Sequence, residues 1–267
     1  MIRITKFRCN SFDELSYLVW AGNACVIIDP GFDSEAEFDA LHKAIKENGI
    51  TPSGILLTHA HPDHVYGVHR LCEEWGIPVY ANRGEEVTLG ALHALCANLG
   101  HPDVEGFSSR IKWIEDGDRI FVSENTACVR KADETGTMTG MPGGLEFKVL
   151  STPGHTAGGV CYLCREFRKA AASEESNAKE GDGSAVASHE TDKWKVLFSG
   201  DTLFAGCIGR SDLPGGDYTA LMQGIFTKLL CLDGGIDVLP GHGPATTISE
   251  ERMKNPFLQP FNEPYEE

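Results

Sequence analysis

Apolar residues in the first hundred positions recur with two alternating periods, which predicts strands and helices in turn. Short runs rich in valine, isoleucine and aromatic residues predict strands at 1–7, 16–20, 24–28, 54–59 and 78–81. Apolar residues at helical spacing predict helices at 34–48, 65–75 and 83–99. Gly49, Gly76 and Gly100 follow these helices directly, where glycine commonly ends a helix.

The rest of the chain is richer in strand-like segments. Apolar runs predict strands at 111–114, 119–122, 145–150, 159–164, 195–204 and 235–240, and helices at 218–232 and 248–254. This order of elements predicts an α/β (α+β) fold with two sheets between outer helices, in one domain over 1–267. The stretch 170–192 is acidic and low in complexity, so we expect a mobile insertion there.

The net charge of −16 limits the partners that this chain can bind. Sequence-independent binding to nucleic acid or to an anionic membrane needs clusters of lysine and arginine, and the sequence has none. No apolar run reaches the roughly 18 residues of a membrane span, and the N-terminus lacks the apolar core of a signal peptide. We therefore expect a cytoplasmic protein that acts on a small molecule.

Residues 58–64, THAHPDH, place three histidines and an aspartate at the end of a predicted strand. An extended chain turns His59 and His61 to the same side, and Pro62 suits the first turn of a helix that would carry Asp63 and His64. Imidazole and carboxylate groups bind zinc and other first-row metals, and a metal compensates for the desolvation of so many polar groups. A chance pattern, or a surface cluster of histidines without metal, is the alternative.

Three further residues lie beside glycines where later predicted strands end: His155, Asp201 and His242. Taken alone, each has an ordinary interpretation as a loop or turn residue. Strand ends are, however, where sheet proteins commonly place their sites. Together with 58–64 these residues give seven candidate ligands. Seven are too many for one tetrahedral metal, and they suit two metals with one bridging carboxylate.

The nine cysteines include one CxxC pair, Cys161 and Cys164, of the kind that binds zinc or serves redox chemistry. This pair lies in a predicted strand, where residues three apart point to opposite faces. We therefore expect buried, reduced thiols rather than a metal or redox site.

The HxHxDH motif followed by single His, Asp and His residues resembles the metallo-β-lactamase superfamily over nearly the whole chain. The resemblance implies a four-layer αββα sandwich. It also implies two divalent metal ions, zinc or alternatively iron or manganese, held by two sets of three ligands and one bridge: His59, His61 and His155; Asp63, His64 and His242; and Asp201. Aspartate at the bridging position, where antibiotic-hydrolysing members typically have cysteine, argues against β-lactam hydrolysis.

Residues 200–217, GDTLFAGCIGRSDLPGGD, are similar to glyoxalase II, the hydroxyacylglutathione hydrolases, and to their short relatives. This resemblance implies a thioesterase that cleaves S-lactoylglutathione or a related acyl thioester with a metal-bridging hydroxide, which Asp63 would orient. Arg210 is the candidate for binding a substrate carboxylate, and an ion pair with Asp212 or Asp217 is its alternative role. The helical domain that follows the last metal ligand in glyoxalase II has no counterpart in residues 243–267.

Three other functions remain open at this stage. A persulfide dioxygenase of the same fold has a similar GRTD-like stretch and binds a single iron through two histidines and one aspartate. The seven filled positions favour hydrolysis over that chemistry. The second of these alternatives is another hydrolase of the superfamily, such as a lactonase. A non-enzymatic metal-binding protein fits least, because structural metal sites are closed rather than built with open positions.

Overall fold

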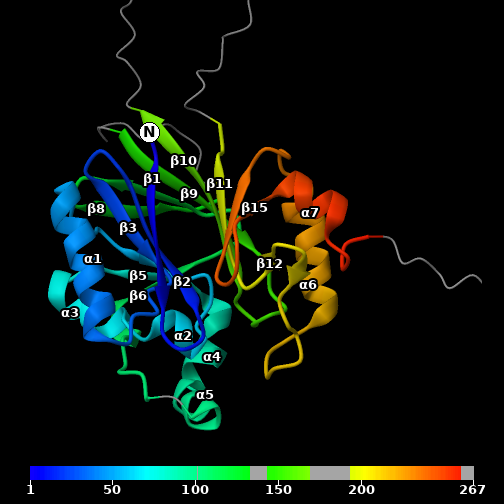
Figure 1. Cartoon of the computed structure of the whole chain (residues 1–267), viewed down its shortest axis with the longest axis horizontal. Helices are drawn as coiled ribbons and strands as arrows, with labels where there is room; N and C mark the ends of the chain where they lie inside the picture. Colours follow the sequence, from blue (N-terminus) through cyan, green and yellow to red (C-terminus); the bar gives the residue numbers. More distant parts are fainter. Residues whose placement is uncertain (101, 133–142, 169–192, 260–267) are drawn as a thin grey trace, which may run out of the picture.

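The computed structural model describes residues 1–100, 102–132, 143–168 and 193–259. Two β-sheets lie face to face in the middle of the molecule, and helices cover the outer face of each sheet (Figure 1). This arrangement confirms the predicted αββα sandwich. The insertion predicted at 170–192 lies outside the described residues. Among the described residues, no helix is both long and apolar enough to cross a membrane.

The first sheet has six strands in chain order, antiparallel through β3 and parallel from β3 to β6. They are β1 (Arg3–Cys9), β2 (Glu14–Ala21), β3 (Ala24–Ile28), β4 (Ile55–Leu56), β5 (Val79–Asn82) and β6 (Ile111–Ile114). Parallel neighbours need crossover connections, and these carry the helices. The helices are α1 (Glu35–Asn48), α2 (Pro62–Val65), α3 (Val68–Trp75), α4 (Glu86–Gly90) and α5 (Leu92–Leu99), with short 3₁₀ turns η1 (Arg83–Glu85) and η2 (Ser108–Arg110).

The second sheet has seven strands in the order β15-β14-β11-β10-β9-β7-β8. They are β7 (Arg119–Ser123), β8 (Thr126–Arg130), β9 (Gly143–Ser151), β10 (Val160–Arg168), β11 (Val196–Gly200), β14 (Asp237–Pro240) and β15 (Thr246–Thr247). A small hairpin, β12 (Leu203–Phe204) and β13 (Cys207–Ile208), follows β11. The helical elements on this side are α6 (Tyr218–Gly224), the π-helical turn η4 (Ile225–Leu229) and α7 (Ile248–Lys254).

Three apolar cores hold the four layers together. One lies between the first sheet and its helices, one between the two sheets, and one between the second sheet and α6 and α7. Strand β10 contributes to two of them, because Cys164 belongs to the core between the sheets and Cys161 to the core under α6. The two residues of the CxxC pair therefore point to opposite faces of the sheet, as predicted. Both thiols are buried and free.

Helix boundaries were predicted correctly where a local cap decides them. Gly49, Gly76 and Gly100 end α1, α3 and α5 in the left-handed conformation, with φ of 62°, 64° and 70°. The single helix predicted at 65–75 is instead divided between α2 and α3. The N–H of Gly67 donates to the Pro30 carbonyl at 2.8 Å, and a Cβ at Gly67 would lie 3.0 Å from the same oxygen. This contact with the loop after β3 interrupts the helix.

Candidate metal centre

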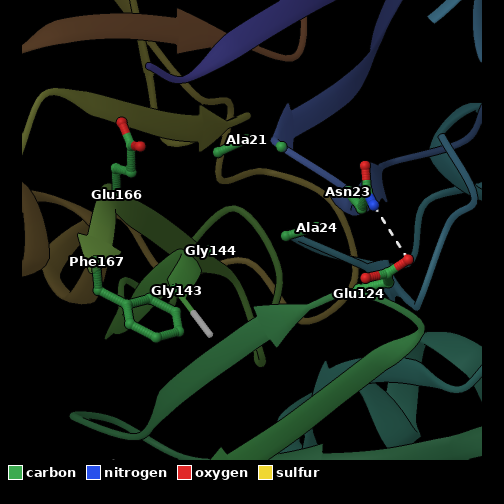
Figure 2. A pocket seen from close by; sticks show the side chains of 9 residues that line it. Ala21, Asn23, Ala24, Glu124, Gly143, Gly144, Glu166 and Phe167 are labelled. Carbon is green, nitrogen blue, oxygen red and sulfur yellow. Dashed lines mark hydrogen bonds between the residues drawn. The ribbon is translucent and has the colours of Figure 1, made fainter. Parts of the chain in front are cut away.

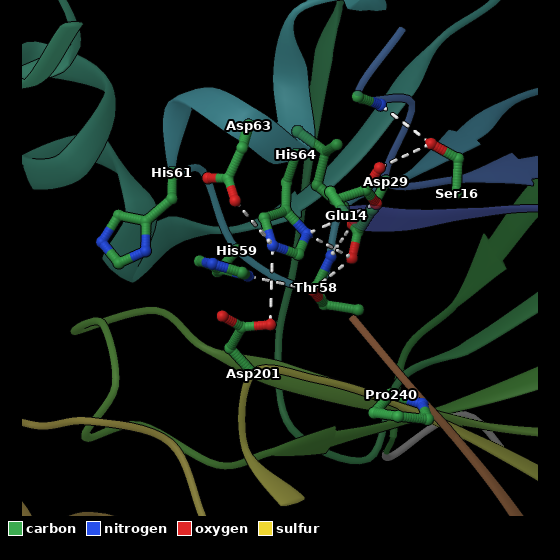
Figure 3. Close-up of polar contacts among 12 residues, drawn as sticks. Glu14, Ser16, Asp29, Thr58, His59, His61, Asp63, His64, Asp201 and Pro240 are labelled. Atoms are coloured by element: carbon green, nitrogen blue, oxygen red, sulfur yellow. Dashed lines mark hydrogen bonds and ion pairs between the residues drawn. The ribbon is translucent and has the colours of Figure 1, made fainter. Parts of the chain in front are cut away.

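Loops from both sheets meet at one end of the sandwich and carry all seven predicted ligands. Residues 58–64 follow β4, His155 follows β9, Asp201 follows β11 and His242 follows β14. Figure 3 shows Asp201, which follows a strand of the second sheet, facing His59 from the loop after β4 and Asp63 and His64 from α2, the helix that continues this loop. The helix start was also predicted, since Pro62 occupies the first turn of α2 after His61 as N-cap.

The six predicted terminal ligands fall into two groups of three. The ligand atoms of His59, His61 and His155 lie within 4.8 Å of one another, and so do those of Asp63, His64 and His242. These are the two sets that the family resemblance implies. The structure therefore brings the expected residues together in the expected partition, and their binding of metal stays a prediction.

Asp201 lies between the two groups and contacts both. Its Oδ2 atom is 3.5 Å from His155 Nε2 in the first group, and its Oδ1 atom is 3.5 Å from His64 Nε2 in the second. A Cβ at Gly241 would collide with Asp201 Oδ1 and with the His64 ring, so glycine is required beside the aspartate. One carboxylate therefore occupies the position that a bridging ligand needs.

Several buried polar atoms at this centre have no hydrogen-bond partner among the described residues: His59 Nε2, His64 Nε2 and Asp201 Oδ1. Buried polar atoms are nearly always paired, because an unsatisfied one costs about 1–3 kcal/mol. Divalent cations held by the two groups would satisfy these lone pairs. Imidazole nitrogen and carboxylate oxygen suit zinc, iron and manganese alike, so the residues fit the predicted metal ions without selecting among them.

Burial and neighbouring charge shift the pKa values of the two ligand groups in different directions. Burial, followed by the adjacent imidazoles, lowers the pKa of His59 well below its usual value, and burial together with His155 lowers the pKa of His61 to about 4. Burial alone would raise the pKa of Asp63, but His64 and His242 outweigh it and lower that pKa. The pKa values of His64 and His242 are instead raised, because the carboxylates of Asp63 and Asp201 outweigh the effect of burial. Near neutral pH the low pKa values keep His59 and His61 neutral and Asp63 ionised, which are their metal-binding forms.

A buried carboxylate behind His64 was missed by sequence reasoning. Asp29 follows β3, and its Oδ2 atom accepts a hydrogen bond from His64 Nδ1 at 3.2 Å. Asp29 also accepts the backbone N–H and the hydroxyl of Thr58, at 2.7 and 2.5 Å. A proton on Nδ1 leaves His64 Nε2 available for a metal, so Asp29 orients a ligand rather than serving as one. The signal that the sequence offers is a carboxylate at the end of a buried strand, directly before Pro30 and Gly31, which is equally typical of a turn.

A second buried carboxylate, Glu85, holds the two loops of the first ligand group together. It accepts hydrogen bonds from the N–H of Ala60 at 3.0 Å, from the Thr156 hydroxyl at 2.5 Å and from the N–H of Gly158 at 3.1 Å. Ala60 lies between His59 and His61, and Thr156 follows His155. Burial raises the pKa of Glu85, and these hydrogen bonds oppose the increase.

We expect Glu85→Gln to weaken metal binding about 10- to 100-fold, the range typical for residues that orient metal ligands. Glutamine places an amide donor where the carboxylate accepts three hydrogen bonds, so the first ligand group loses its spacing. Glu86→Gln is the matched control, because the Glu86 side chain is 62% exposed and pairs only loosely with Arg83. Competition with a chelating dye measures the affinity. Equal affinity in both variants would contradict the positioning role.

Arg210 lies beside the centre through its backbone, because its carbonyl accepts a hydrogen bond from His155 Nδ1 at 2.8 Å. Its guanidinium is exposed and forms two hydrogen bonds of 2.8 Å to Asp212. Asp217 instead caps α6 by accepting the N–H of Ala220. The structure thus contains the alternative ion pair to Asp212, and a substrate-binding role for Arg210 stays a prediction.

A cavity of about 350 Å³ lies at the opposite end of the sandwich, beside the turn between β2 and β3 (Figure 2). Its walls include Glu166, Phe167 and the pair formed by Asn23 and Glu124, whose side chains are 3.0 Å apart. None of the seven candidate ligands lines it. The histidine-rich end is therefore the candidate functional site.

Comparison with known proteins places the chain in a family. The sequence profile of the Metallo-beta-lactamase superfamily matches residues 11–166. Hydroxyacylglutathione hydrolase GloC of Haemophilus influenzae is 31% identical, over 93% of this chain and 94% of the relative. The crystal structure of TTHA1623 in a di-iron-bound form superposes with a TM-score of 0.67 at 29% identity, covering 95% of this chain and all of the other. The crystal structure of the BLEG-1 B3 metallo-beta-lactamase superposes with the same TM-score at 30% identity, covering 97% of this chain and all of the other. The chain belongs to the metallo-beta-lactamase superfamily of metal-dependent hydrolases.

Proposed function

We propose that this protein is a binuclear thioesterase of the glyoxalase II type, which hydrolyses S-lactoylglutathione or a related acyl thioester. The observation that supports two metals is the position of Asp201, whose oxygens face both ligand groups at 3.5 Å. Thioester specificity is supported by the similarity to the GloC relative and by the GDTLFAGCIGRSDLPGGD segment. The di-iron form of TTHA1623 supports a two-metal centre in a related structure.

When bound, two divalent ions would lower the pKa of water and polarise the substrate carbonyl. The protein's own groups prepare the site for that chemistry. Asp63, kept ionised by His64 and His242, offers a carboxylate that accepts a hydrogen bond from the attacking water. Asp29 and Glu85 fix His64 and the first ligand group, so little reorganisation is needed during the reaction. A thiolate is a good leaving group and needs little help from a general acid.

Removal of metal is expected to abolish thiol release from S-lactoylglutathione, and zinc, iron or manganese should restore it. The assay is carried out under argon after treatment with a chelator, so that hydrolysis is separated from any reaction that consumes oxygen. Full activity in the chelated protein would contradict a metal-dependent mechanism. Oxygen uptake with glutathione persulfide, in the absence of hydrolysis, would instead favour the dioxygenase. Nitrocefin cleavage would favour a β-lactamase like BLEG-1.

A further inference from the structure

A cleft of about 370 Å³ is lined by His242 and by none of the other six candidate ligands. Lys6 and Arg8 of β1 and Phe12 of the following turn line it together with His242. Its volume is within the range of pockets that bind small molecules. The cleft reaches the second ligand group at His242, and its walls come from the N-terminal hairpin and from the loop of His242, Gly243 and Pro244.

The inner face of β1 changes character as the strand approaches the metal centre. Ile4 packs against the core between the two sheets, and Lys6 and Arg8 follow on the same face because side chains alternate along a strand. Phe7, on the other face, packs against the core under the outer helices. Along this face of β1, an apolar residue at the core is thus followed by two cations, and both of these line the cleft.

The charges of Lys6 and Arg8 differ in how far they are already paired within the protein. Within the described part of the chain, no ion pair or hydrogen bond involves the Lys6 ammonium group. Arg8 is held by Asp13, with 2.5 Å between Nη2 and Oδ2. Asp13 adopts φ of 58° in the turn after β1 and lines the same cleft, so the pair lies at its mouth with both side chains exposed. Two cations and one anion leave net positive charge in this cleft, within a chain of net charge −16.

The turn that closes the cleft also supports the metal centre. The Phe12 carbonyl accepts a hydrogen bond from His242 Nδ1 at 3.2 Å, while the Phe12 side chain is 39% exposed. Charged residues on an edge strand often serve only to prevent pairing with another sheet. Arg3, exposed at the start of the same strand, fulfils that purpose without lining the cleft. Lys6 and Arg8, which line the same cleft as His242, are therefore placed to contact a ligand bound there.

We propose that Lys6 and Arg8 bind an anionic group, carboxylate or phosphate, on the thiol carrier of the substrate, while its acyl end lies at the metal centre. This inference rests on the proposed thioesterase function and specifies the substrate class. Side chains two apart on a strand are separated by about 6.6 Å along it, so the two cations contact different oxygens or different anionic groups.

The test compares three lactoyl thioesters: lactoylglutathione with carboxylates, lactoyl-coenzyme A with phosphates, and the uncharged lactoyl-N-acetylcysteamine. Lys6→Glu and Arg8→Glu should each raise KM for an anionic thioester about tenfold or more, as expected for the loss of a charged hydrogen bond. The preference for anionic over neutral substrate should fall by a similar factor. The thioester whose KM changes identifies the anion. Arg3→Glu makes the same change of charge and should leave all three KM values within twofold of wild type.

Binding is measured separately from turnover by calorimetry with S-hexylglutathione and S-ethyl-coenzyme A, thioethers that cannot be hydrolysed. Affinity that falls in the two glutamate variants but not in Arg3→Glu supports the cleft, even if the wild type cleaves no thioester and the proposed function fails. Hydrolysis with KM and affinity unchanged in both variants would overturn the cleft and leave the thioesterase intact. Lys6→Gln and Arg8→Gln decide the matter if either glutamate variant fails to fold.

Discussion

Replacing Asp201 by alanine is expected to lower kcat for thioester hydrolysis about a thousandfold, a loss of about 4 kcal/mol of transition-state stabilisation. Asp201 contacts His155 in one ligand group and His64 and His242 in the other, at 3.5 to 3.7 Å. Its removal should therefore separate the two metal sites, and metal content should fall together with activity.

Asp237→Ala is the matched control for this change. Asp237 is an exposed aspartate on β14, between Ile236 and Val238, which belong to the core under α6. Its replacement should leave kcat within twofold of wild type. Steady-state kinetics with S-lactoylglutathione and elemental analysis of each variant provide the measurements. An Asp201→Ala protein that keeps two metals and more than a tenth of wild-type kcat would refute the bridging role.

Asp29→Ala is expected to lower the free energy of unfolding of the metal-free protein by about 3–5 kcal/mol, because a buried network loses its central charged partner. The backbone N–H of Thr58 and the ring of His64 would both lose their acceptor. Asp29 also adopts φ of 45°, where alanine is disfavoured by about 1–2 kcal/mol. Urea unfolding measures the change, and metal is removed first because a bound ion would itself stabilise the fold.

Asp29→Asn separates the structural role from the effect on metal binding. Asparagine tolerates the same backbone conformation and still accepts the Thr58 N–H, so we expect less than half of the loss in stability. Its amide, however, presents a donor to His64 Nδ1 and favours the tautomer with a proton on Nε2. Metal affinity should therefore fall even where the fold is kept. Unchanged affinity in Asp29→Asn would show that His64 does not depend on Asp29 for its orientation.

The sequence predicted most clearly those features that neighbouring residues decide. The glycines after α1, α3 and α5 end those helices, as their position in the sequence predicts. Alternation along β10 sends Cys161 and Cys164 into different cores. The interruption between α2 and α3 was not predictable, because it results from contact of Gly67 with Pro30, which is distant in the chain.

The candidate site likewise contains residues that a local sequence pattern predicts and residues that only the tertiary structure brings together. The seven ligand-type residues were found because histidine and aspartate beside glycine at strand ends form an unusual local pattern. Asp29 and Glu85 were missed because their partners come from other segments: Asp29 meets His64, and Glu85 meets Ala60 and Gly158. Lys6 and Arg8 belong to an ordinary-looking strand, and only the packing of the sheets places them next to His242. Such residues become visible when the tertiary structure is known.

The number of metal ions per chain tests the binuclear centre most directly. The purified protein is loaded with zinc, freed of excess by gel filtration and measured by elemental analysis against protein concentration. We expect two ions per wild-type chain, because each ligand group holds one and Asp201 faces both. One ion per chain, after loading with zinc, iron or manganese in turn, would contradict the two-metal centre.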